Sequence, residues 1–149
     1  MNILDMIKAE NEMLFEMINT LRFEKDALIS DNIESLQKAV INKEKLKSHI
    51  GEIEKIRIEI YGLKSLKEIL PDLSEEDRAI AQSLGIDMER LVSDVQEMNL
   101  INENLIKQSL NYVKFVLNVM SPHKVSVYGS SGRALNHDGE SSRVINKSI

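Results

Sequence analysis

Apolar side chains that recur every seven residues are the feature that most constrains this chain. In the first segment they are Ile7, Leu14, Leu21 and Leu28. A seam with this period lies on one face of an α-helix that packs against another helix, which predicts a helix from about residue 3 to residue 29. Asn11 and Lys25 are polar at companion positions, where either a buried Asn that fixes register or exposure near a helix end is consistent with the pattern.

A second helix is predicted after the break at Ser30. Asp31 followed by Glu34 resembles a capping box, which places the helix start there. The helix then carries a seam that begins at Ile33, Leu36 and Val40 and fades through the polar run Lys43-Glu44-Lys45. The seam resumes, shifted, at Leu46, Ile50, Ile53, Ile56, Ile60 and Leu63. The short break predicts an antiparallel hairpin with the first helix, and Pro71 is expected to end or interrupt the second one.

The third long helix is expected after a short connector. Ser74 is a strong N-cap, Gly85 would stop a short helix at Leu84, and Asp87 would cap the last helix. That last helix has a seam at Met88, Leu91, Val95, Met98, Leu105, Tyr112, Val116 and Val119, with polar breaks at Asn102 and Ser109. The fold class predicted is all-α: an elongated antiparallel three-helix bundle or coiled coil with a short connector helix and a flexible C-terminal tail.

Charge and composition divide the chain near Pro122. Residues 1–120 carry a net charge of −7, whereas residues 121–149 carry +2, seven Ser and three of the six Gly. We therefore expect a helical bundle domain over 1–120 and a flexible basic tail over 121–149. The absence of cysteine excludes disulfide scaffolds and thiol catalysis, and with no signal-peptide pattern and no stretch long enough to cross a bilayer we expect a cytoplasmic protein without membrane insertion.

A second apolar seam lies beside the first near the end of the last helix. It consists of Ile106, Leu110, Val113, Leu117 and Met120, and Phe115 adds to the apolar circumference there. Two interpretations are open. Both seams could pack inside a three-helix bundle, or part of this surface could be left for an amphipathic helix of another protein.

The sequence gives little support for metal binding, catalysis or nucleic-acid binding. The three histidines have no partner at metal-ligand spacing, and no nucleophile, phosphate-binding or dinucleotide motif occurs, so we expect no metal, no cofactor and no enzymatic activity. The charge of −7 over residues 1–120 opposes nucleic-acid binding. The residues alone predict a helical interaction module.

The order of the motifs resembles the FlgN family of flagellar export chaperones. The N-terminal part carries Leu21-x-x-Glu24-Lys25-Asp26-Ala27-Leu28, then Asp31, Leu36, Lys43-x-x-Leu46 and Ile53-Glu54-x-x-Arg57. The C-terminal part carries Asn99-x-x-Asn102-x-x-Leu105-Ile106, then Leu110-x-Tyr112, and Tyr128-Gly129-x-x-Gly132 beyond the helix. The resemblance covers approximately residues 4 to 132.

This resemblance implies a cytoplasmic chaperone of flagellar type III secretion. Its partners would be the C-terminal amphipathic segments of hook-associated junction proteins, kept monomeric and presented to components of the membrane export gate. The client-binding residues expected are Ile106, Leu110, Val113, Leu117, Met120, Phe115 and Tyr128. The alternative is a structural coiled-coil protein that forms homo-oligomers through the same surface and has no export client.

Overall fold

The computed structural model describes residues 1–120, which form helices and turns and contain no strand. Contacts between Cα atoms divide the chain into two units, residues 1–103 and residues 104–149. The last described helix, α4 (Glu75–Met120), continues through the boundary between them. The expected tail over 121–149, including Tyr128, lies outside the described residues.

Helix α1 (Ile3–Ile29) begins at a capping box. The side chain of Asn2 accepts a hydrogen bond of 2.8 Å from the backbone N–H of Asp5, and the Asp5 carboxylate accepts one from the N–H of Asn2. These bonds satisfy two N–H groups that the first turn would otherwise leave unpaired. The predicted extent of the first helix is confirmed.

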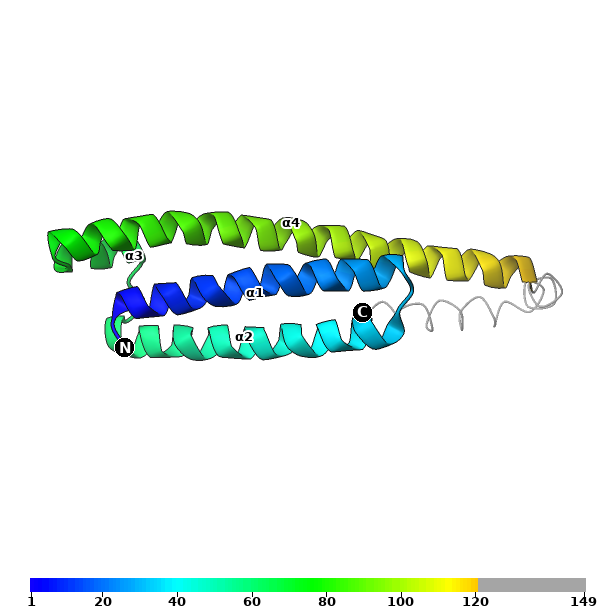
Figure 1. The fold of residues 1–149 in the computed structure, drawn as a ribbon, viewed down its shortest axis with the longest axis horizontal. Helices are drawn as coiled ribbons and strands as arrows, with labels where there is room; N and C mark the ends of the chain where they lie inside the picture. The colour runs from blue at the N-terminus through cyan, green and yellow to red at the C-terminus, as the bar shows by residue number, and fades with distance from the viewer. Residues whose placement is uncertain (121–149) are drawn as a thin grey trace, which may run out of the picture. The chain divides into compact units, whose positions relative to one another are not determined.

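The turn after α1 differs in detail from the prediction. Asp31 adopts a left-handed conformation (φ 52°), and the side chain of Asn32 accepts a 3.0 Å hydrogen bond from the N–H of Ser35 to start α2 (Ile33–Tyr61). The expected cap by Asp31 with Glu34 is wrong, because Asp31 serves as a turn residue, a conformation that Asp tolerates better than most residues. α2 runs antiparallel to α1 as expected (Figure 1).

The connector starts earlier than Pro71. α2 ends at Tyr61 because Gly62 takes a positive φ of 66°, which a glycine adopts without steric cost. A short helix α3 (Leu66–Ile69) and a 3-10 turn η1 (Leu70–Asp72) follow, and Pro71 lies inside that turn. Arg78 of α4 links that helix to the connector by donating hydrogen bonds to the backbone carbonyls of Leu70 (3.0 Å) and Leu73 (3.2 Å).

Helix α4 begins where the sequence predicted and then continues without a stop. The Ser74 hydroxyl accepts a 3.1 Å hydrogen bond from the N–H of Asp77, which confirms the cap. The expected stop at Gly85 and new cap at Asp87 are wrong. Gly85 remains helical, and a Cβ there would lie 2.9 Å from Leu66 Cδ2, so this glycine permits close packing of the connector instead of ending a helix.

Residues 1–103 form a three-helix bundle, and the predicted all-α class is confirmed. Its buried cluster of Ile3, Ile7 and Ile69 is covered by Tyr61 of α2 and by Leu84, Met88 and other residues of the connector and α4. The Asn11 side chain donates a 3.0 Å hydrogen bond to the carbonyl of Leu84, so this polar seam position joins α1 to α4. Within this unit α4 runs in the same direction as α1 (Figure 1).

Candidate functional site

A buried polar cluster joins the three long helices inside residues 1–103. The Glu24 carboxylate of α1 accepts hydrogen bonds from Lys43 Nζ of α2 (2.9 and 3.2 Å) and from Asn102 Nδ2 of α4 (2.8 Å). Asn102 also donates a 3.0 Å bond to the carbonyl of Leu21. Glu24 and Asn102 are each 2% exposed, so these bonds form away from water, where their loss is costly.

A second polar contact supports the α1–α2 side of this cluster. Asn42 Nδ2 donates a 2.6 Å hydrogen bond to the hydroxyl of Thr20, which in turn donates to the carbonyl of Glu16 (2.9 Å). Thr20 is buried. Because Thr20 and Glu24 lie four residues apart on one face of α1, the two contacts line the same stretch of the hairpin.

The 104–120 segment of α4 differs from the buried polar cluster in that it exposes apolar side chains. Its large apolar side chains are mostly exposed, among them Tyr112 (68%), Phe115 (64%), Leu117 (59%) and Met120 (76%). Soluble proteins rarely leave a contiguous set of large apolar side chains in water, and such sets mark interaction surfaces. This segment is therefore the candidate functional site.

The five residues of the second seam differ in exposure along the helix. Ile106 and Leu110 are half-buried, whereas Val113, Leu117 and Met120 are exposed. Since residues three and four positions apart are neighbours on a helix surface, all five form one continuous stripe along α4. We refer to these five residues as the α4 stripe.

Phe115 does not belong to the α4 stripe. At about 100° per residue, it lies on nearly the opposite side of the helix from Leu117. A single straight partner helix that covered the stripe would therefore not cover Phe115. Tyr128 cannot be placed, since it lies outside the described residues.

The interpretation in which both seams are core does not hold at the end of the helix. Tyr112 and Val119 of the first seam are exposed, as are the last three residues of the α4 stripe. A heptad pattern predicts that a helix face packs against another helix. It does not show whether that second helix belongs to the same chain or to another protein.

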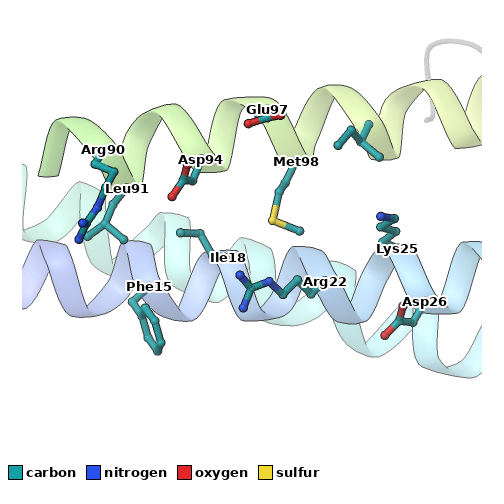
Figure 2. A pocket seen from close by; sticks show the side chains of 11 residues that line it. Phe15, Ile18, Arg22, Lys25, Asp26, Arg90, Leu91, Asp94, Glu97 and Met98 are labelled. Carbon is teal, nitrogen blue, oxygen red and sulfur yellow. The ribbon is translucent and has the colours of Figure 1, made fainter. Parts of the chain in front are cut away.

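A groove between α1 and α4 lies wholly within residues 1–103. Its volume is about 680 Å³, and Ile18, Leu91 and Met98 point into it (Figure 2). Phe15 and Ile101 also line it, together with three basic and three acidic side chains: Arg22, Lys25, Arg90, Asp26, Asp94 and Glu97. This balanced border selects neither a cationic nor an anionic ligand.

The titratable groups with shifted pKa values in the bundle include Glu54 and Glu10, and both interact with Arg57. Arg57 Nε donates a 2.8 Å hydrogen bond to Glu54, which lowers the pKa of the Glu54 carboxyl. Arg57 Nη1 donates a 2.9 Å hydrogen bond to the carbonyl of Lys64 in the connector. Burial, helped by the charge of Glu54, raises the pKa of Glu10, and the charge of Arg57 opposes that rise. Arg57 thus ties the last turns of α2 to the connector.

Two further properties concern only the part of the chain that the structure describes. No group of three or more His, Asp or Glu side chains in residues 1–120 could hold a metal ion. None of the helices described has both the length and the apolar character needed to cross a membrane.

Fold and site together describe a helical protein whose last described helix leaves large apolar side chains exposed. The chain belongs to the FlgN family, since the family model described as FlgN protein matches residues 1–136. No curated protein and no solved structure matches it. The family consists of flagellar export chaperones, which in general bind hook-associated proteins.

Proposed function

We propose that this protein is a cytoplasmic flagellar export chaperone that binds the C-terminal amphipathic segment of hook-associated junction proteins through the α4 stripe. The observation that carries the proposal is the exposure of Val113, Leu117 and Met120 in a chain of the FlgN family. An amphipathic helix recognises its partner by burying apolar side chains spaced three and four residues apart. The stripe has that spacing over 15 residues, Ile106 to Met120.

The mechanism would be masking. A junction protein that has not yet been assembled exposes an apolar helix face that can self-associate, and burial of that face on α4 keeps the protein monomeric and competent for export. Each large aliphatic side chain that becomes fully buried contributes about 1.5–3 kcal/mol before the costs of ordering and association. Several such residues suffice for a specific complex without nucleotide hydrolysis.

Phe115 and Tyr128 remain proposed client-binding residues outside the α4 stripe. Phe115 would contact a client only if that client extends around the helix beyond a single straight packing seam. Presentation of the loaded chaperone to components of the export gate is part of the same proposal.

Light scattering after size exclusion tests the proposal against a self-associating scaffold. The chain is measured alone and after mixing with the C-terminal segments of the hook-associated proteins encoded in the same genome. We expect one chaperone and one segment per complex, and loss of the segment's own self-association. A chain that forms a stable homo-oligomer and leaves every segment unbound would overturn the proposal and favour the scaffold.

A further inference from the structure

The charge of α4 changes abruptly at the start of the candidate site. Acidic side chains occur along the helix as far as Glu103, and none occurs in residues 104–120. The charged residues of that segment are Lys107 and Lys114, a net charge of +2. By contrast, residues 1–103 carry 13 basic and 22 acidic residues, a net charge of −9. The last acidic residue therefore lies at the boundary between the two units.

The two lysines lie along one border of the α4 stripe. Lys107 is three residues before Leu110, and Lys114 is four residues after it and three before Leu117, so each is a surface neighbour of a stripe leucine. Seven residues separate the lysines, which places them almost one above the other after two turns. Both are exposed.

The other border of the stripe has no such charge. Val113 and Met120 adjoin Ser109 and Val116 there, at spacings of three and four residues. The segment is thus an apolar stripe with a cationic border on one side only. In packed helices, charged residues that flank an apolar seam select the partner and its orientation through the opposite charge on the facing helix.

From this asymmetry, and resting on the proposed function, we infer that the client helix carries acidic side chains on one flank of its apolar face, about seven residues apart, and that these pair with Lys107 and Lys114. The charge of −9 on residues 1–103 opposes a client that is acidic throughout. The acidic residues are therefore expected in register with the two lysines and not along the whole client. One-sided pairing also fixes the direction in which the client helix lies on α4.

The test is a titration of the full chain with a synthetic peptide of the C-terminal helix of a hook-associated protein. Lys107→Glu with Lys114→Glu is compared with Lys45→Glu with Lys55→Glu, which makes the same change in net charge at two exposed positions of α2. At low salt we expect the first pair to weaken binding by about tenfold or more and the second pair by about twofold at most. The difference is expected to shrink at high salt, because the pairs are exposed to screening.

A second peptide completes the design. In it, Lys replaces the acidic residues of one flank, and it is expected to bind Lys107→Glu with Lys114→Glu better than the wild-type chain. Equal affinity of the wild-type peptide for both charge variants would overturn the inference. The Leu110→Asp with Leu117→Asp variant separates the two proposals. If the charge variants bind equally but this variant does not bind, the inference about Lys107 and Lys114 is wrong and the proposed function is still supported. If this variant binds normally, the proposed function itself is wrong.

Discussion

The side-chain amide of Asn102 donates a 2.8 Å hydrogen bond to the carboxylate of Glu24, 78 positions earlier in the chain. The same carboxylate accepts from Lys43, so one buried group contacts all three long helices. Buried polar contacts contribute less net stability than apolar packing, but they discriminate between registers because a slipped register leaves them unpaired. We interpret this cluster as the feature that sets the register of α4 on the hairpin.

Replacing Asn102 with Ala is expected to lower the free energy of unfolding by about 2 kcal/mol. The substitution removes two hydrogen bonds, one of them to a carboxylate, at a site that water does not reach. Urea unfolding followed by circular dichroism measures the change. Asn104→Ala, at an exposed position of the same helix, is the control and should stay within about 0.5 kcal/mol of wild type. Equal effects of the two substitutions would show that the Asn102 bonds are not important for stability.

Replacing Glu24 with Leu is expected to cost about 3 kcal/mol, because Lys43 is then left charged and without its partner in a mostly buried position. Adding Lys43→Leu should recover part of that loss, since an apolar pair replaces the ion pair. Ala in place of Glu34, which pairs with Lys38 on the surface, should change stability by less than about 0.5 kcal/mol. A double variant less stable than Glu24→Leu alone would contradict this account of the pair.

The two helical glycines Gly51 and Gly85 should respond differently to alanine. Nothing lies within 4 Å of a Cβ at Gly51, so Gly51→Ala should stabilise α2 by about 0.5–1 kcal/mol. At Gly85 the new Cβ would meet Leu66 Cδ2 at 2.9 Å, and the cost of moving Leu66 should remove that gain. Thermal unfolding of the two variants compares them directly. An equal rise in both would mean that the Leu66 side chain moves aside at little cost in free energy.

Acidity should affect stability through Glu10. Its pKa is raised in the folded chain, chiefly by burial, so the folded state binds a proton more readily than the unfolded state. The ionised carboxylate therefore destabilises the fold at neutral pH, and this penalty disappears as the pH falls through the raised pKa. Glu10→Gln should raise the midpoint of thermal unfolding at pH 7, with a smaller gain at lower pH. A constant difference at all pH values would contradict the assignment to Glu10.

Much of the fold could be predicted from apolar spacing, because seams at Ile7, Leu14 and Leu21 and their counterparts later in the chain require helices that pack together. The helix ends were less predictable. Glycine at position 85 is suited to a helix end or to close packing inside a helix, and the contact with Leu66 shows that it permits packing. Aspartate at position 31 is suited to a helix cap or to a turn, and it lies in the turn because Asn32 caps α2.

The polar cluster was only partly visible in the sequence. Asn102 was noticeable as a break in an apolar seam, and Lys43 lies where the seam of α2 fades, but their meeting at Glu24 depends on the three-helix packing. The α4 stripe could be predicted as a second seam. Its exposure could not, since the spacing of Leu117 and Met120 is the same whether the partner belongs to the chain or to another protein.

Binding of the client through the α4 stripe is tested by calorimetric titration of a hook-associated protein C-terminal segment into the Leu110→Asp with Leu117→Asp variant. The matched control, Ser93→Asp with Gln96→Asp, adds the same charges at exposed positions of the same helix, outside the 104–120 segment. With the helix content of both variants unchanged, we expect affinity to fall by about a hundredfold or more for the first and by about twofold at most for the control. A folded Leu110→Asp with Leu117→Asp variant that binds the segment as tightly as the control would contradict binding through the α4 stripe.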